Sequence, residues 1–315
     1  MKRIRNEKKC VLGIDIGSVS LKIAVLDENK KILNTFYERT NGKPLEKLKE
    51  MFKKIPKNYK IIGVGVTGSA RNFIGKIIGA DIIKNEITSH SYSLAKYYPD
   101  AKTIIEIGGQ DSKIIIFRNK IPVDFSMNTV CAAGTGSFLD QQANRIGIPI
   151  EKFGKICLKS KKELNVGGRC TVFSESDMIQ KQQAGHEIKD IINGLCNNLV
   201  KNYLNNVAKG KNLEKPYIFI GGVAANIGIV KAFERQLKSK IIVPKYYNVM
   251  GAIGIALIVL ENIPEKSKFK GLDFAKYKIK KDFFSCDSCD NKCDIIKISI
   301  DDETTYLGSK CGRYE

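Results

Sequence analysis

Two acidic residues, Asp15 and Glu106, each end an apolar stretch and are each followed by a glycine turn. Residues 14–26 (IDIGSVSLKIAVL) align without gaps on residues 105–117 (IEIGGQDSKIIIF) at a constant offset of 91. Glycine lets main-chain N–H groups approach phosphate oxygens closely. A carboxylate beside such a turn can hold Mg²⁺ mainly through water, because this ion dehydrates reluctantly. The repeat therefore predicts a phosphate-binding protein that uses Mg²⁺, with one acid from each copy facing the same ion.

The polar residues of the repeat are assigned by the atoms that they can offer. Lys22 and Lys113 are either phosphate contacts or solvated strand residues, and neither assignment is preferred. Gln110 and Asp111 are the candidates for orienting an attacking water, since phosphoryl transfer depends chiefly on positioning and charge stabilisation. The predicted phosphate-binding residues are Gly17, Ser18, Val19 and Ser20 in the first turn and Gly108, Gly109 and Gln110 in the second.

Two cysteines stand where a helix is expected to begin. Cys131 opens the segment CAAGTGSFLDQQANRIG, and Cys170 precedes TVFSESDMIQKQQ. The partial positive charge of a helix N-terminus favours a thiolate, and neighbouring glycine N–H groups can bond to sulfide. An iron–sulfur cubane needs about four thiolates, so a symmetric dimer could complete one cluster from two cysteines per chain. Two unligated thiols are the alternative.

The last segment of the chain has its own cysteine pattern. Cys286, Cys289, Cys293 and Cys311 have the spacing C-x2-C-x3-C-x17-C within a lysine-rich tail, residues 263–315. Close thiolates repel one another unless a cation neutralises them, so the spacing predicts a metal site. Structural zinc is slightly favoured over a second iron–sulfur cluster.

The remaining cysteines and both histidines are assigned to structural roles. Cys157 and Cys196 lie in apolar segments and are expected to be core thiols, and Cys10 is expected to be incidental. His90 and His186 have no neighbouring ligand at metal spacing and are expected in the structure or on the surface.

The elements that must position these residues alternate between strands and helices, which indicates an α/β fold with two facing layers. Residues 11–14 and 103–107 have the continuous hydrophobicity of strands buried on both faces. The predicted helices span 44–54, 69–79, 89–98, 136–146, 175–183 and 186–207. The predicted division is a basic arm (1–10), a first subdomain (11–100 with a helix at 249–262), a second subdomain (101–248) and the tail (263–315).

Composition narrows the class of partner. The formal net charge is +20, but the lysines are scattered and do not interleave with aromatic residues as a nucleic-acid groove requires. The most apolar stretch, residues 249–260, is too short to span a bilayer. No apolar signal-peptide core follows the basic arm, so we expect a cytoplasmic protein that binds neither nucleic acid nor membrane.

A third glycine turn, in residues 217–226 (YIFIGGVAAN), completes a known order. The three turns resemble the phosphate-one, phosphate-two and adenosine motifs of the actin-like, ribonuclease H-like ATPase fold, which is shared with sugar kinases. This resemblance implies duplicated ATPase domains with ATP or ADP in a cleft between the two halves. By the same resemblance, Gly221, Gly222 and Asn226 border the adenine and ribose.

Longer motifs are more specific, and they cover about residues 11–262. The sequence resembles the ATP-dependent activators of 2-hydroxyacyl-CoA dehydratases, which are related to the ATPase subunits of benzoyl-CoA reductase. The resemblance rests on GIDIGSVSLKIAVL, VTGSAR (66–71), EIGGQDSK (106–113), NTVCAAGTGSFLDQQA (128–143), GGRCTVFSESDMI (167–179) and GGVAAN (221–226). Within the fourth motif, Gly134, Thr135 and Gly136 are counted among the cofactor-binding candidates.

The resemblance implies an anaerobic redox function. It predicts a homodimer with one 4Fe-4S cluster held by Cys131 and Cys170 of each subunit. The cluster would accept an electron from ferredoxin or flavodoxin and pass it, at the expense of ATP, to an iron–sulfur acyl-CoA dehydratase or a related double-cluster reductase. Hinge motion of the two halves would be carried to the cluster by the helices that follow these cysteines.

Two other functions are also compatible with the sequence. A small-molecule kinase of the same fold would need a sugar-like pocket, and a nucleotide-switched interaction protein would need no cluster. The tail resembles the cysteine-rich junction of larger fused relatives. The chain is therefore either a stand-alone variant or a fragment.

Overall fold

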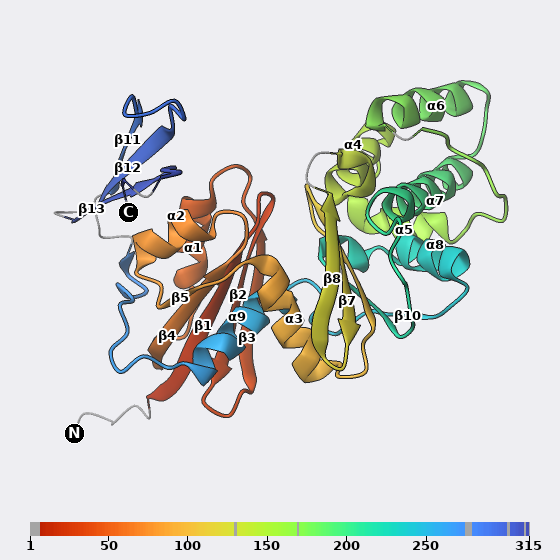
Figure 1. The fold of residues 1–315 in the computed structure, drawn as a ribbon. Coiled ribbons are helices and arrows are strands. Elements are labelled where there is room, and N and C mark those ends of the chain that lie inside the picture. Colours follow the sequence, from red (N-terminus) through yellow and green to blue (C-terminus); the bar gives the residue numbers. More distant parts are fainter. Residues whose placement is uncertain are drawn as a thin grey trace. The chain divides into compact units, whose positions relative to one another are not determined.

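The computed structural model describes residues 7–128, 131–168, 170–274, 279–300, 303–311 and 313–314. It contains two compact units (Figure 1). Unit 1 is Met1–Ser93 with Gly251–Glu315, and unit 2 is Leu94–Met250. Helix α3 (Glu86–Tyr97) runs across this division. In the described part of the chain, no helix combines the length and the apolarity that crossing a bilayer requires.

Unit 1 is built on a five-stranded mixed sheet in the order β3-β2-β1-β4-β5. Its first three strands are antiparallel neighbours, and β4 and β5 continue the sheet in parallel. The strands are β1 (Lys8–Ile16), β2 (Ser20–Asp27), β3 (Ile32–Arg39), β4 (Tyr59–Thr67) and β5 (Ile82–Ile83). The continuous hydrophobicity of β1 corresponds to burial on both faces, as expected.

Helices cover both faces of this sheet. One face of β1, with Leu12 and Ile14, packs in a core with α1 (Pro44–Phe52) and α2 (Arg71–Ile78). The opposite face carries Gly13, where an added Cβ would lie 1.9 Å from the carbonyl oxygen of Ala252 in α9 (Met250–Glu261). Apart from its final residues α9 is buried, which explains why it is apolar around its whole circumference.

Unit 2 repeats the plan of unit 1. Its sheet has the order β10-β9-β6-β7-β8, which is the unit 1 order read from the other edge. The strands are β6 (Thr103–Ile107), β7 (Ser112–Arg118), β8 (Ile121–Asn128), β9 (Tyr217–Ile220) and β10 (Ile241–Ile242). The β6–β7 hairpin occupies the position of β1–β2, so the 91-residue repeat is a structural duplication. The predicted actin-like α/β class is confirmed.

Five helices share one hydrophobic core with the second sheet, and Figure 1 shows them on the same side of it. They are α4 (Gly136–Ile146), α5 (Ile150–Cys157), α6 (Thr171–Gln183), α7 (Ile188–Asn206) and α8 (Ile227–Leu237). Helix α4 has the predicted bounds, whereas α5 and α8 were not predicted. The start of α8 carries a recognisable signal, because the Asn226 side chain accepts from the N–H groups of Gly228 and Ile229 as an N-cap.

The tail forms a three-stranded antiparallel sheet of β11 (Ile279–Ser285), β12 (Asp294–Ile300) and β13 (Glu303–Leu307). Phe274, Ile298 and Ile300 are buried in the same core as α1 and α2. The Lys76 ammonium of α2 donates to the carbonyl oxygen of Tyr306 at 3.0 Å. The tail is therefore packed onto unit 1, although its sequence has no clear apolar period.

Candidate functional site

The first glycine turn joins β1 to β2. Its geometry is closed by the Gly17 N–H, which donates to the carbonyl oxygen of Ser20 at 3.0 Å. Asp15 and Lys22 are register partners across the hairpin and form an ion pair at 3.3 Å. Ser18 at the tip is exposed, whereas the Asp15 side chain is buried at the base.

Two neighbouring segments hold this turn in place. The Thr40 hydroxyl donates to the carbonyl oxygen of Ser18 at 3.1 Å, and the Ser69 hydroxyl donates to that of Ile16 at 3.3 Å. Gly68 has φ +100°, and a Cβ there would lie 2.3 Å from the Ile16 carbonyl oxygen. The VTGSAR motif thus buttresses the turn from the end of β4.

The second turn, between β6 and β7, repeats this geometry. The Gly108 N–H donates to the carbonyl oxygen of Asp111 at 3.0 Å. Lys113 pairs with Glu106 at 3.0 Å and with Asp111 at 2.7 Å, and its side chain is only 2% exposed. The solvated alternative for Lys113 is therefore wrong. Lys22, at 16% exposure in its own ion pair, is not a freely solvated strand residue either.

The repeat extends to a third strand. Gly221 follows β9 as Gly68 follows β4, and it also has a positive φ, +90°. A Cβ at Gly221 would lie 2.4 Å from the carbonyl oxygen of Ile107, as a Cβ at Gly68 would meet Ile16. Each unit therefore packs a glycine against the strand that ends in its acidic turn, because only glycine permits this close approach.

The third turn itself contains Gly221, Gly222 and Asn226. The Gly221 N–H donates to the carbonyl oxygen of Tyr247 at 2.9 Å, and Gly222 is exposed. The Asn226 side-chain oxygen caps α8 and lies against Gly154 of α5. Asn226 thus has a structural role as the cap of α8, and Gly222, before it in the chain, is an exposed residue of the turn.

The second turn is hydrogen-bonded to the segment that follows Cys131. The Gly136 N–H donates to the carbonyl oxygen of Gly108 at 2.9 Å, and the Ser137 N–H donates to that of Gly109 at 2.8 Å. The buried Thr135 hydroxyl donates to the Ala132 carbonyl oxygen at 2.8 Å. The N–H groups of Gly136 and Ser137 thus join the turn to α4, whereas the Thr135 hydroxyl closes the short turn that precedes this helix.

Cys131 is half-buried and caps the short 3₁₀ helix Ala132–Gly134. Asn128 holds its main chain on both sides. The Cys131 N–H donates to Asn128 Oδ1 at 2.9 Å, and Asn128 Nδ2 donates to the Cys131 carbonyl oxygen at 2.7 Å. Asn128 was not predicted as a site residue, although it opens the motif NTVCAAGTG.

Cys170 is exposed and is the N-cap residue of α6. The glycines before it are held by buried amides of α7. Asn198 Nδ2 donates to the carbonyl oxygen of Gly167 and Asn202 Nδ2 to that of Gly168, both at 3.2 Å. These amides orient the chain just before the thiol, and sequence reasoning missed them because they lie inside a helix.

Helix α7 also contacts the strand of the second turn. The Tyr203 hydroxyl donates to the carbonyl oxygen of Lys113 at 2.8 Å, and the Tyr203 side chain is fully buried. Tyr203 neighbours Asn202 on the same helix. One rigid element therefore touches both β7 and the loop that precedes Cys170.

A further missed position lies beside Asp15. A Cβ added to Gly251 would lie 2.7 Å from Asp15 Oδ2 and 3.1 Å from His90 Cε1. Both histidines were expected either in the structure or on the surface. His90 is buried and His186 is exposed. Gly251 thus leaves the space that the Asp15 carboxylate occupies at the start of α9.

The metal predictions meet a simple chemical test. Within the described residues, no three or more His, Cys, Asp or Glu side chains form a group that could hold a metal ion. Cys131 and Cys170, each an N-cap residue, would supply two of the four thiolates that a cubane needs, and the other two would have to come from elsewhere. Asp15 and Glu106 are buried carboxylates with the hard oxygen donors that suit water-coordinated Mg²⁺.

The other thiols lie in the core, as expected for Cys157 and Cys196. A hydrogen bond with Cys196 lowers the pKa of Cys157, and the same bond together with burial raises the pKa of Cys196. Burial raises the pKa of Cys10 to about 12. All three thiols are protected from solvent, and the raised pKa values of Cys10 and Cys196 also disfavour their thiolates.

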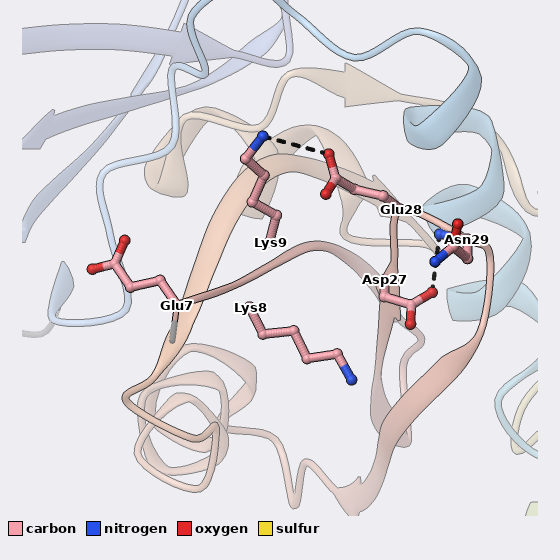
Figure 2. A pocket seen from close by; sticks show the side chains of 6 residues that line it. All are labelled: Glu7, Lys8, Lys9, Asp27, Glu28 and Asn29. Carbon is pink, nitrogen blue, oxygen red and sulfur yellow. Dashed lines mark hydrogen bonds and ion pairs between the residues drawn. The ribbon is translucent and has the colours of Figure 1, made fainter. Parts of the chain in front are cut away.

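A surface hollow lies at the other end of the β1–β2 pair (Figure 2). Its lining residues are Glu7, Lys8, Lys9, Asp27, Glu28 and Asn29. Lys9 and Glu28 pair at 3.7 Å, and Asp27 accepts from the Asn29 N–H at 3.0 Å. The Cys10–Asp27 register pair is remote from the turn at Gly17, so this hollow is separate from the site.

The duplicated sheets and their glycine turns define the actin-like ATPase class. A family model described as the BadF/BadG/BcrA/BcrD ATPase family matches residues 12–259, and the chain belongs to this family. The 2-hydroxyisocaproyl-CoA dehydratase activator of Clostridioides difficile is 32% identical over 274 residues, covering 82% of this chain and 97% of the relative.

Two solved activators share the fold. The structure of the 2-hydroxyisocaproyl-CoA dehydratase activator from Clostridium difficile with bound ADPNP has a TM-score of 0.73 at 32% identity, covering 81% of this chain and 95% of that one. Component A of the Acidaminococcus fermentans (R)-2-hydroxyglutaryl-CoA dehydratase has a TM-score of 0.76 at 30% identity, covering 81% and 98%. The tail, residues 263–315, lies beyond the family match.

Proposed function

We propose that this protein hydrolyses ATP to drive a single electron from a 4Fe-4S cluster, shared by two copies of the chain, into an iron–sulfur acyl-CoA dehydratase or a related double-cluster reductase. The observation that carries the proposal is a set of hydrogen bonds within unit 2. They join one acidic glycine turn to the segments that bear Cys131 and Cys170. The names of the relatives, which are dehydratase activators, support the choice of partner.

The acidic turns supply the nucleotide chemistry. Gly17 and Gly108 use their N–H groups to close the turns, so phosphate would be bound by the N–H groups that follow, those of Ser18 and Val19 and those of Gly109 and Gln110. Asp15 and Glu106 would hold the waters of Mg²⁺, and the ion would offset charge on the phosphates. Lys113 holds the Asp111 carboxylate at 2.7 Å, which leaves the exposed Gln110 amide as our choice for orienting the attacking water.

Coupling follows from the bonded route. Loss of the γ-phosphate would shift the Gly108 and Gly109 carbonyl groups. The N–H groups of Gly136 and Ser137, which donate to these carbonyl groups, would move with them, and so would the turn that starts at Cys131. A displacement of β7 would be transmitted to α7 by the Tyr203 hydrogen bond, and from α7 to the loop before Cys170 by the Asn202 hydrogen bond. Nucleotide can act in this way only if it binds the two arrangements with different affinity.

The cluster site requires a second chain, since each chain offers two suitable thiols. When bound, the cluster supplies the low-potential electron, and ferredoxin or flavodoxin is the class of donor that restores it. Val172 and Phe173 follow Cys170 and are 65% and 69% exposed. Exposed apolar side chains beside a thiol mark a surface that a partner covers, so we place the two-fold contact of the homodimer there.

The proposal is tested by anaerobic purification and by iron and sulfide analysis. The chain should be a brown dimer with one 4Fe-4S cluster per two chains, and Cys131→Ser should remove this cluster. Cys157→Ser, which alters a buried thiol outside the site, is the matched control and should stay brown. A Cys131→Ser protein that keeps its visible absorption after all four tail cysteines are also changed would refute the shared cluster.

A further inference from the structure

The tail brings its four cysteines to one end of a small sheet. Strands β11 and β12 pair in register up to Ser285 and Asp294, and the next residues on each side are Cys286 and Cys293. The Cys286 N–H donates to the carbonyl oxygen of Cys293 at 2.8 Å. Both residues are buried beside Ile295. The first and third cysteines therefore leave the hairpin side by side.

The loop between them carries the second cysteine. It turns sharply at Lys292, whose φ is +39° and whose N–H donates to the carbonyl oxygen of Cys289 at 3.1 Å. Cys289 is exposed and is separated from Cys286 by two residues and from Cys293 by three. These short tethers keep its thiol near the end of the hairpin.

The fourth cysteine is anchored to the same end from both sides. Strand β13 ends with Leu307 opposite Ile296, and a Cβ at the next residue, Gly308, would lie 2.2 Å from the carbonyl oxygen of Asp294. Beyond Cys311, the Tyr314 ring packs on Phe284 at 5.6 Å between centroids. Along the chain, Cys311 thus lies between Gly308, which contacts Asp294 next to Cys293, and Tyr314, which contacts Phe284 near Cys286.

We propose that Cys286, Cys289, Cys293 and Cys311 bind one structural Zn²⁺ ion per chain. None of these thiols is in a disulfide, and within the described residues their sulfur atoms do not converge into a group of three. Mutual repulsion of thiolates opposes convergence without a cation, and Zn²⁺ removes it by binding four sulfurs tetrahedrally at about 2.3 Å. The backbone already brings the four residues together, so the step that remains is rotation of side chains and adjustment of a short loop.

Zinc fits better than a second cubane because of exposure. Cys289 and Cys311 are exposed, and an iron–sulfur cluster at that position would be open to solvent. Zn²⁺ has no redox chemistry and tolerates this position. The site would fasten the end of the tail sheet, which packs through Ile298 and Ile300 in the core with α1 and α2. It does not depend on the proposed electron transfer.

The test uses the full chain with Cys131→Ser and Cys170→Ser, so that metal found in the protein belongs to the tail. This protein is produced with both iron and zinc supplied, desalted, and analysed for zinc, iron and sulfide per chain. We expect one zinc and no sulfide. Adding Cys289→Ser and Cys311→Ser should abolish zinc retention, while the matched loop variant Ser288→Ala with Asp290→Ala should keep it.

Thiol protection gives a second readout that does not need an unchanged fold. Native mass spectrometry after alkylation should show the four tail thiols protected until a chelator removes the metal. The assignment is overturned if the four-cysteine tail retains no metal, if it retains iron with sulfide, or if zinc persists without Cys289 and Cys311.

Discussion

At the residue scale, the chemistry depends on charged groups that the fold has removed from water. Lys113 is buried and pairs with two carboxylates, those of Glu106 and Asp111, and Asp15 pairs with Lys22. Removing one partner of a buried ion pair leaves an uncompensated charge, which is far costlier than losing a surface pair. These lysines therefore hold the Asp15 and Glu106 side chains in place.

Cys10 gives a prediction about pH. Its thiol has an ordinary pKa of 9.0, and burial raises the pKa to about 12 in the folded chain. The folded state thus retains a proton that the unfolded state loses, so this contribution to stability is complete below pH 9 and is lost as pH rises toward 12. Relative to Cys10→Ala, the wild type should lose about 1.4 kcal/mol of unfolding free energy per pH unit above 9. Urea unfolding of both proteins at several pH values measures this, and parallel curves would contradict it.

At the element scale, α9 and α7 have different tasks. Helix α9 lies so close to the unit 1 sheet that glycine is required at Gly13, Gly63 and Gly65. Helix α7 instead carries polar side chains into the interior, where Asn198, Asn202 and Tyr203 bind main-chain carbonyl groups. Helix α9 therefore packs tightly against the unit 1 sheet, whereas α7 connects two parts of the site in unit 2.

The close packing of α9 predicts a large effect of one methyl group. Gly13→Ala should lower the free energy of unfolding by about 3 kcal/mol or more, because the added Cβ meets backbone that cannot move independently. Gly134→Ala is the matched control, since its nearest neighbour would be 3.8 Å away. Thermal and denaturant unfolding of both variants checks the difference, and equal stability would rule out the tight contact.

The connection through α7 predicts a separation of two activities. Tyr203→Phe removes one buried hydrogen bond, which costs about 1 kcal/mol of stability. ATP hydrolysis should persist, while ATP-dependent electron delivery to a dehydratase should fall several-fold, because the hydrogen bond that links α7 to β7 is lost. Rates of both reactions, measured on the same cluster-loaded sample, test this. A parallel fall of the two rates would mean that Tyr203 serves only the fold.

At the scale of the whole molecule, the proposed activity requires two copies of the chain. Phe173→Glu should yield a folded monomer without the shared cluster, since an exposed side chain contributes little to folding but a charge there opposes the two-fold contact. Phe283→Glu is the matched control, because Phe283 is 72% exposed in the tail. Sedimentation and iron analysis distinguish them, and a dimeric, brown Phe173→Glu protein would place the interface elsewhere.

The sequence alone determined what depends on neighbouring residues. The strand, acid, glycine turn and second strand of each repeat are local patterns, so the duplication could be read from an offset of 91 residues. The cysteines at 131 and 170 could be placed at helix starts for the same reason, as the structure confirms. The spacing of the tail cysteines was visible too, but not the sheet that gathers them.

Tertiary structure decided what depends on distant residues. Lys113 looked as if it could be solvated, and only the packing of β7 showed that it is buried between two acids. Asn198 and Asn202 looked like ordinary helix residues until α7 was placed against the glycines before Cys170. Gly251 gained its meaning only beside Asp15, more than two hundred residues away. Local patterns fix backbone shape, whereas burial and hydrogen-bond partners arise from contacts between segments that the order of the sequence does not reveal.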